Sequence, residues 1–385
     1  MATIAATMSA LAPTPSAPAF VPASDHPQEL IDRVRDAVAA RARLRIVGGG
    51  SKSFVHASVE GEALDTRVHS GILSHEPSEL VVTVRAGTPL AELEAALAEH
   101  GQCLPFEPPR LGPGGTVGGA VAAGLAGPAR AAVGGARDYV LGARLLNGRA
   151  ELLTFGGQVM KNVAGYDVSR ALAGSWGALG LITELSLKVL PVAPAEATLC
   201  FALDQAQALD HLHRWGGQPL PINASRWQDG RLWLRLRGAL AAVEAACPRL
   251  MAEAGGERLD PAAAAADWTA CRDHQLAFLR QAPSPGHGLW RVSLPQTADA
   301  LLAAWPQLIE WQGAQRWLWA PLAAAGEIRA AARAAGGHAQ LLRAPAAGEG
   351  GVARADAPAP AMAALMRRLR EAFDPHGVFA APEFF

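Results

Sequence analysis

The sequence predicts an α+β protein of two domains. The chain has 385 residues, about 2.5 times a typical domain of roughly 150 residues. Strands alternate with helices in the first half, where two glycine-rich loops also occur, and Pro191 and Pro194 then mark a boundary. Beyond it, strand–helix–strand–strand–helix patterns recur. We therefore expect an α/β domain over 25–195 and an α+β domain over 196–372, whose antiparallel sheet is made of ferredoxin-like units.

In the N-terminal half, hydrophobic spacing defines each element. Apolar residues at helical spacing predict the first helix, and β-branched runs predict the strands. Thr88 is the expected N-cap of a helix that has Pro89 in its first turn and that Gly101 ends. The dipeptide Asn147-Gly148 predicts a hairpin. The expected elements are a helix at 28–42, strands at 44–47, 80–84, 139–146 and 150–155, a helix at 167–173, and a half-exposed strand at 181–190.

The C-terminal half shows two similar series of elements. The first begins after the prolines, and the second begins at Gly288. The expected order is strand 196–202, helix 205–215, strands 223–228 and 231–237, helix 238–254, strand 288–294, a helix after Gln296, strands 308–311 and 315–319, a helix from Leu322, and strand 339–342.

Composition excludes several classes of protein. The 34 basic residues offset 35 acidic ones, which predicts no nucleic-acid partner. The four cysteines are too far apart for a C-x-x-C motif, an iron–sulfur cluster or a disulfide framework, so we expect a cytoplasmic protein with no metal site. Residues 1–24 are an uncharged Ala/Pro tail, which we expect to be disordered and which lacks a secretory n-region. The uncharged stretch 111–129 is too rich in glycine to span a membrane.

Two glycine-rich loops carry the functional signal. The first, Gly48-Gly-Gly-Ser-Lys-Ser53, follows a strand, and the second, Pro113-Gly-Gly-Thr-Val-Gly-Gly119, leads into a helix. Backbone N–H groups of such loops, and those of a helix start, can converge on a phosphate. Neither loop has the G-x-G-x-x-G spacing, and no Gly-Lys dipeptide exists, so a Rossmann site and a P-loop are disfavoured. For either loop alone, a tight turn without a ligand is an equally good interpretation.

Five motifs in order resemble the vanillyl-alcohol oxidase type, also called PCMH type, of FAD-binding domain. They are GGGSKS at 48–53, GGTVGGAVAAG at 114–124, VGGARDYVLGARLL at 133–146, KNVAGYD at 161–167 and GSWGALGLITELSLKVL at 174–190. Within that type, QVMKNVAGYDVSR at 158–170 is similar to the FAD-binding subunits of bacterial glycolate oxidases. The resemblance implies two α/β subdomains with an extended FAD between them, and a C-terminal tail at 373–385 that returns toward the flavin domain.

The resemblance also implies which residues bind the cofactor. The two loops would hold the pyrophosphate, the segment after Gly180 would hold the adenine side, and Asp138 lies in a loop that approaches the flavin. The first loop has no histidine for a covalent bond, His56 being the nearest, so FAD is expected to be non-covalent. The implied contacts are Gly48, Gly49, Gly50, Ser51, Lys52, Ser53, Pro113, Gly114, Gly115, Thr116, Val117, Gly118, Gly119, Asp138, Lys161, Gly180, Leu181 and Ile182.

Substrate-oxidising residues are harder to find. Met160 stands where related 2-hydroxy acid dehydrogenases have an arginine for the substrate carboxylate, and no histidine lies in their C-terminal His-x-x-Gly-Asp-Gly-Asn-x-His type motif. No catalytic residue is predicted. KNVAGYD has an alternative interpretation as a structural loop, in which Asp167 caps the next helix.

The resemblance implies an FAD-binding subunit of a glycolate oxidase complex, which works with a second flavin subunit and an iron–sulfur subunit on a small 2-hydroxy acid. We expect no membrane span of its own, with contact to the inner membrane only through those partners. Two alternatives stay open. The chain could be an independent FAD-dependent oxidoreductase of a small alcohol or 2-hydroxy acid, or a structural subunit without a catalytic site of its own.

Overall fold

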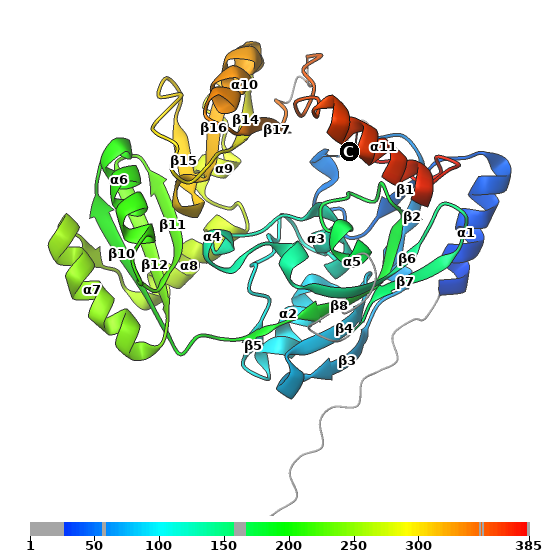
Figure 1. Ribbon diagram of the computed structural model, residues 1–385, viewed down its shortest axis with the longest axis horizontal. Coiled ribbons are helices and arrows are strands. Elements are labelled where there is room, and N and C mark those ends of the chain that lie inside the picture. The colour runs from blue at the N-terminus through cyan, green and yellow to red at the C-terminus, as the bar shows by residue number, and fades with distance from the viewer. Residues whose placement is uncertain (1–26, 56–58, 158–166, 346–347, 349, 383–385) are drawn as a thin grey trace, which may run out of the picture.

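The chain forms two α/β subdomains and a C-terminal sheet that faces them (Figure 1). A computed structural model describes residues 27–55, 59–157, 167–345, 348 and 350–382.

The first subdomain is a helix on a small parallel sheet. Helix α1 (Pro27–Ala40) buries Leu30 and Val34, which are four residues apart on one face, against β1 (Leu44–Val47). Strand β1 pairs in parallel with β2 (Glu62–Asp65). The predicted first helix and first strand are both confirmed.

The C-terminal tail completes this subdomain. The carbonyl of Val378 accepts a hydrogen bond from Leu44 N at 2.7 Å, and Ala380 N donates to the Leu44 carbonyl at 2.8 Å. Between them, Phe379 is fully buried in the same core as α1. The buried carboxylate of Asp374 accepts from Val378 N and Phe379 N at 2.9 and 2.8 Å. The tail therefore returns to the edge of β1, as the resemblance implies.

Asp374→Ala is expected to destabilise the first subdomain by roughly 2–4 kcal/mol, because two buried N–H groups lose a charged acceptor. Urea unfolding followed by circular dichroism would measure this loss. The matched control is Asp32→Ala, which removes an exposed carboxylate on α1 and should change stability by less than about 1 kcal/mol. Equal midpoints for the two variants would contradict the role given to Asp374.

The second subdomain is an antiparallel sheet of five strands in the order β3-β4-β8-β6-β7. Helices α2 and α3 pack on it in one core. The strands are β3 (Ile72–Glu76), β4 (Val81–Arg85), β6 (Val140–Leu146), β7 (Leu152–Gly156) and β8 (Leu181–Lys188), with the pair β5 (Gln102–Cys103) and β9 (Leu190–Pro191) beside them. The helices are α2 (Leu90–Ala98), α3 (Val117–Ala123), α4 (Arg130–Val133) and α5 (Val168–Ala171).

Two local expectations are wrong in this subdomain. Strand β8 is not half-exposed, because it lies between β4 and β6 and its Thr183 and Ser186 are buried. The N-cap of α2 is Pro89, since the Thr88 hydroxyl instead bonds Gly71 and the Arg85 carbonyl. The predicted hairpin of β6 and β7 is confirmed, although the loop between its strands spans five residues, 147–151, instead of the Asn-Gly dipeptide alone. The predicted cap of α5 by Asp167 is confirmed, with its carboxylate accepting from Arg170 N.

The C-terminal half is one antiparallel sheet in the order β13-β10-β12-β11-β15-β16-β14-β17. Its two halves have the strand orders of ferredoxin-like units and join where β11 pairs with β15, which confirms the predicted architecture. The strands are β10 (Ala195–Ala202), β11 (Ile222–Gln228), β12 (Arg231–Gly238), β13 (Glu257–Arg258), β14 (His287–Ser293), β15 (Gln307–Glu310), β16 (Gln315–Pro321) and β17 (His338–Arg343). The helices are α6 (Gln205–Gly216), α7 (Leu240–Ala254), α8 (Pro261–Arg272), α9 (Ala277–Arg280) and α10 (Ala325–Ala334), followed by α11 (Pro360–Phe373).

The helix expected after Gln296 does not form. The fully buried Arg316 donates to the carbonyls of Ala298 and Asp299 at 2.6 and 2.7 Å. In a helix, those carbonyls would accept hydrogen bonds from the N–H groups of the next turn. Here the Arg316 side chain is the donor instead. The second ferredoxin-like unit therefore lacks its first helix.

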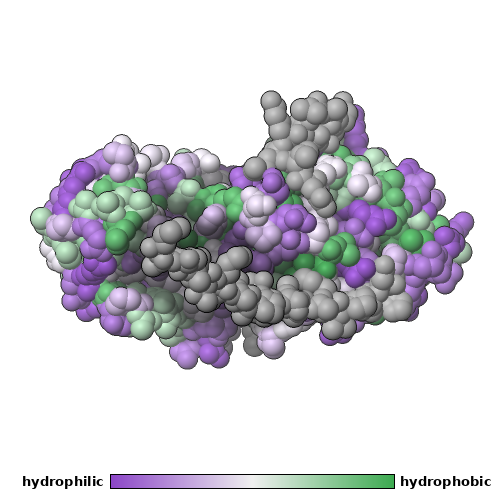
Figure 2. Space-filling view, turned by 90° about the horizontal axis from the view of Figure 1, so that it is seen from below, coloured by the Kyte–Doolittle hydropathy of each residue, from purple (hydrophilic) through white to green (hydrophobic). Residues whose placement is uncertain are grey.

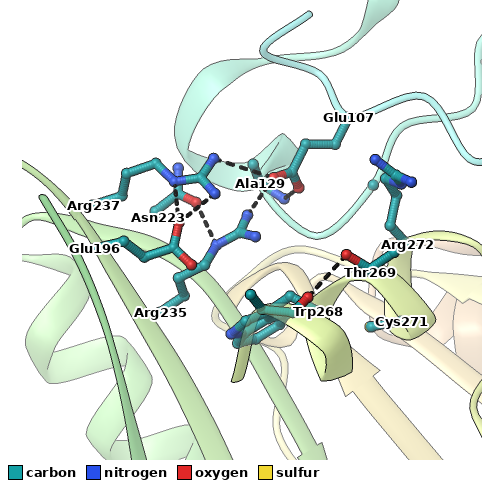
Figure 3. A network of polar contacts seen from close by, with 12 residues as sticks. Glu107, Ala129, Glu196, Asn223, Arg235, Arg237, Trp268, Thr269, Cys271 and Arg272 are labelled. Atoms are coloured by element: carbon teal, nitrogen blue, oxygen red, sulfur yellow. Dashed lines mark hydrogen bonds and ion pairs between the residues drawn. The ribbon is translucent and has the colours of Figure 1, made fainter. Parts of the chain in front are cut away.

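A buried ionic cluster joins the two halves (Figure 3). Glu107, in the loop after β5, accepts from Arg235 of β12 at 2.6 Å and from Arg237 at 3.3 Å. Its other oxygen accepts from Ala129 N at 3.0 Å. Arg235 is 3% exposed and also donates to Asn223 at 2.7 Å. This cluster fixes the C-terminal sheet against the N-terminal half.

No helix in the described part of the chain combines the length and apolar character that crossing a bilayer needs. On the face shown in Figure 2, hydrophobic residues lie in small patches among hydrophilic ones.

Candidate functional site

A cleft that is partly open to solvent lies between the two α/β subdomains. Both glycine loops and the start of β8 line it. The predicted residues that it brings together are Gly48, Gly49, Gly50, Ser51, Lys52, Ser53, Thr116, Gly118, Gly119, Gly180, Leu181 and Ile182.

The first loop offers free backbone donors. Among the described residues, none accepts a hydrogen bond from the N–H of Gly49, Gly50, Ser51 or Lys52. The loop is closed by Ser53 N, which donates to the Gly50 carbonyl at 3.0 Å, and Gly50 has a φ of +68°. Successive free N–H groups in such a turn form a concave anion-binding surface. The first loop therefore has the donors that a phosphate requires.

The two loops fit together only because Gly49 has no side chain. A Cβ built on Gly49 would lie 1.5 Å from the Gly114 carbonyl oxygen and 2.8 Å from Gly115 N. Contacts this short do not occur between real atoms, so any side chain at Gly49 would force the two backbones apart. The close approach explains why glycine stands at position 49.

The second loop works differently from the expectation. Helix α3 begins at Val117, and Thr116 is its N-cap, with its hydroxyl accepting from Gly119 N. Val117 N and Gly118 N donate to the carbonyls of Thr88 and Ala86 at 2.9 and 2.8 Å. The first three amides of the helix are thus already bonded, so the expectation that they face an anion is wrong. This loop instead shapes the wall of the cleft and holds the first loop in place.

The charges of the cleft suit an anion. Arg45 and Lys52 are the ionisable side chains among the described residues that line it, and both are cationic. Burial lowers the pKa of Lys52 to about 8. A buried cation without a counter-ion is costly, and a bound phosphate removes that cost.

Other predicted residues lie elsewhere. Pro113 and Gly114 line a neighbouring cavity that also touches Gly49, and Gly115 packs beside Ser51. Val117 is buried in the core of the second subdomain, and the Asp138 carboxylate accepts from Gly135 N at 2.8 Å, away from both cavities. Lys161, Met160 and His56 lie outside the described residues.

Sequence reasoning missed Arg45 and Trp176, which also line the cleft. Arg45 lies on β1, the strand that precedes the glycine loop. Nothing in the sequence of such a short strand indicates that this residue lines a cleft. Trp176 adopts a φ of +51°, a left-handed conformation that is unusual for a bulky residue. The signal that could have identified Trp176 is its position in the motif GSWGALGLITELSLKVL at 174–190.

Comparisons with known proteins agree with this geometry. Residues 18–156 match the family described as "FAD binding domain". The chain is 44% identical to glycolate oxidase subunit GlcE of Escherichia coli over 92% of this chain and 96% of that protein. It is 31% identical to glycolate oxidase subunit GlcD of Bacillus subtilis over 33% of this chain and 27% of that protein.

Solved structures share the fold. An alkyldihydroxyacetonephosphate synthase superposes with a TM-score of 0.63 over 94% of this chain and 75% of its own, at 16% identity. Xylooligosaccharide oxidase from Myceliophthora thermophila superposes with a TM-score of 0.64 over 93% of this chain and 89% of its own, also at 16% identity.

Together, the fold and the matched domain define an FAD-dependent oxidoreductase with a flavin domain of the vanillyl-alcohol oxidase type. Its cofactor is FAD. The chain belongs to the family of glycolate oxidase subunit GlcE.

The cleft fits this cofactor. Free amides, two cations and a glycine contact suit a pyrophosphate, while Ala86, Ala122 and Leu181 supply apolar wall. When bound, FAD supplies a two-electron acceptor, and the protein supplies position and electrostatics.

Lys52 should make FAD binding depend on pH. Since its pKa in the cofactor-free protein is about 8, the ammonium is present at pH 7 and mostly lost at pH 9. The FAD affinity of the wild-type protein is expected to fall on the order of tenfold over that range. Fluorescence titration of the apoprotein with FAD measures it.

Lys52→Met should bind FAD more weakly at pH 7 and show a flat profile between pH 7 and pH 9. Lys188→Met is the matched control, since Lys188 lies at the end of β8 and is not in the cleft. It should keep the wild-type profile. A sloping profile in the Lys52→Met protein would contradict the assignment to Lys52.

Proposed function

We propose that this chain is the FAD-binding subunit of a glycolate oxidase complex, which oxidises glycolate to glyoxylate. The observation that carries the proposal is the 44% identity to GlcE, which extends over 92% of this chain and 96% of that protein. Similarity of that extent covers the C-terminal sheet as well as the flavin domain, so both halves of the subunit are present.

In this proposal the first loop and Lys52 hold the pyrophosphate, and the loop containing Thr116 fixes their position. Gly180, Leu181 and Ile182, at the start of β8, hold the adenine side. The pyrophosphate role is supported by the free amides of the first loop and by the two cations that line the cleft, Arg45 and Lys52. Asp138 and Lys161 stay candidates for contacts nearer the flavin ring.

The partners in this proposal are a second FAD-containing subunit and an iron–sulfur subunit. The four cysteines of this chain are free, and Cys200, Cys247 and Cys271 are buried. Burial raises the pKa of all three thiols, which disfavours the thiolate form that a cluster binds. This supports an iron–sulfur cluster on another subunit. We place the complex in the cytoplasm, at the inner membrane through the partner subunits.

Anaerobic absorption spectra test the proposal. The full-length chain is purified alone and together with its co-expressed partner subunits, and glycolate is added to each sample. The proposal is supported if this chain contains flavin and if glycolate bleaches the flavin absorbance of the complex. Bleaching of the isolated chain shows an independent enzyme instead, and a chain free of flavin in both samples overturns the FAD-subunit role.

A further inference from the structure

A second, smaller cavity lies where the flavin domain meets the C-terminal sheet. It shares Ala123 and Trp176 with the FAD cleft. Its polar side chains are Arg291, Gln340 and Arg354, and Leu125, Leu341 and Leu342 complete the wall. A small apolar cavity with a few convergent polar groups has the composition of a ligand site.

Arg291 is held in place without a carboxylate. Its Nε donates to Gln315 at 2.8 Å, and its guanidinium lies 5.5 Å from the ring centre of Trp311. No carboxylate among the described residues forms an ion pair with it. The nearby Glu310 is buried and accepts from the Trp317 indole and the Cys271 thiol instead.

A second cation lies close to Arg291. Arg130 lies over the same Trp311 ring, at 4.9 Å, so two guanidinium groups share one aromatic side chain. Burial and the charge of Arg130 lower the pKa of Arg291 to about 10, against the opposing effect of the Glu310 carboxylate, so Arg291 still carries its charge at neutral pH. A cation held in a cavity next to another cation favours an anionic ligand.

Gln340 completes the polar side. It stands directly opposite Arg291 in the pairing of β14 with β17, so both side chains lie on the same face of the sheet. An amide beside a guanidinium provides one more donor for an oxygen ligand. Figure 1 shows these strands, β14 and β17, at the side of the C-terminal sheet that reaches toward the flavin half.

We propose that Arg291 and Gln340 form a binding site for a small carboxylate, of the 2-hydroxy or 2-oxo acid class, in this subunit itself. The guanidinium fork matches both oxygens of a carboxylate. The cavity is smaller than the FAD cleft, so it suits a small ligand. The proposal rests on the proposed function and extends it, because it gives the subunit a ligand site beside its own FAD cleft.

The test uses the full-length chain loaded with FAD and isothermal titration calorimetry with oxalate, a small carboxylate that the flavin cannot oxidise. The wild-type protein should bind oxalate, and Arg291→Gln should weaken binding by roughly tenfold to a hundredfold. Arg367→Gln, on the exposed face of α11, removes the same charge and should bind like the wild type. FAD content and thermal midpoint are measured for each variant.

Gln340→Glu keeps the test decisive should Arg291→Gln fold poorly. A glutamate opposite Arg291 pairs with it internally, so the variant should fold well and exclude oxalate. Undiminished oxalate binding in Gln340→Glu or in a folded Arg291→Gln overturns the proposal, as does tighter binding of inorganic phosphate than of oxalate. An Arg291→Gln protein with an altered flavin spectrum and unchanged oxalate binding also overturns it, since Arg291 would then contact the cofactor.

The assembled complex separates this proposal from the proposed function. Glycolate oxidation by the complex together with no oxalate binding by the isolated subunit leaves the proposed function standing and removes the site. If oxalate binding depends on Arg291 but the complex does not oxidise glycolate, the carboxylate site stands and the proposed function fails.

Discussion

Gly49→Ala is expected to abolish FAD binding. The new methyl group would lie 1.5 Å from the Gly114 carbonyl oxygen and 2.1 Å from its carbon. Both atoms belong to backbone, so no side-chain rotation relieves the overlap. The first loop must therefore move by more than an ångström, which displaces the free amides that we assign to the pyrophosphate. A shift of that size removes several hydrogen bonds at once, each worth about 1.5–3 kcal/mol with a charged partner.

Gly112→Ala is the matched control, because it lies beside the same loop and has room for a methyl group. Its nearest atom outside its chain neighbours is Ser51 Cβ at 3.6 Å, an ordinary contact. The flavin absorbance at a fixed protein concentration compares the two variants, with circular dichroism to confirm folding. A Gly49→Ala protein that retains full FAD content would show that the two loops do not need this contact.

The flavin half was predictable because its signals are local. The glycine loops, the strand before them and the cap at Asp167 each lie within a few residues of sequence. The errors have tertiary causes. Strand β8 reads as half-exposed because Thr183 and Ser186 are polar, yet their hydroxyls bond the Arg144 carbonyl and Thr83 across the sheet. Polar residues that find partners in a neighbouring strand can be buried, and hydrophobic alternation does not detect this.

The candidate sites show the same division. Motif residues such as Gly49 and Lys52 were found, whereas Arg45 and Trp176 reach the cleft only through the packing of the two subdomains. Arg291 belongs to no motif. It becomes a candidate only when β14, β16 and β17 pair and place it beside Trp176, in a cavity shared between domains far apart in sequence.

The helix expected after Gln296 is wrong for a related reason. Its sequence is alanine-rich and suits a helix, but Arg316 takes its carbonyls as hydrogen-bond acceptors. A fully buried arginine needs acceptors, and no carboxylate within the described chain pairs with it. The hydrogen-bond acceptors that the buried Arg316 guanidinium requires therefore outweigh the local helix propensity of this segment.

Glu107→Ala is expected to destabilise the contact between the two halves by about 3–5 kcal/mol, because it leaves Arg235 buried without its counter-charge. Glu107 accepts from two arginines of the C-terminal sheet and from Ala129 N in its own domain. It also stands at a φ of +48°, so the loop geometry presents the carboxylate to the sheet (Figure 3). Glu107→Gln keeps the shape and one acceptor, so it should cost less than alanine.

Tryptophan fluorescence during urea unfolding measures this effect selectively, since nine of the ten tryptophans lie between Trp215 and Trp319 in the C-terminal half. Glu62→Ala is the control, because its pair with Arg33 is exposed and should contribute no more than about 1 kcal/mol. A double-mutant cycle with Arg235→Gln separates the pair from the rest of the cluster. Strong coupling in that cycle identifies the ion pair as the link between the halves. Additive losses would instead mean that packing alone holds the sheet against the flavin domain.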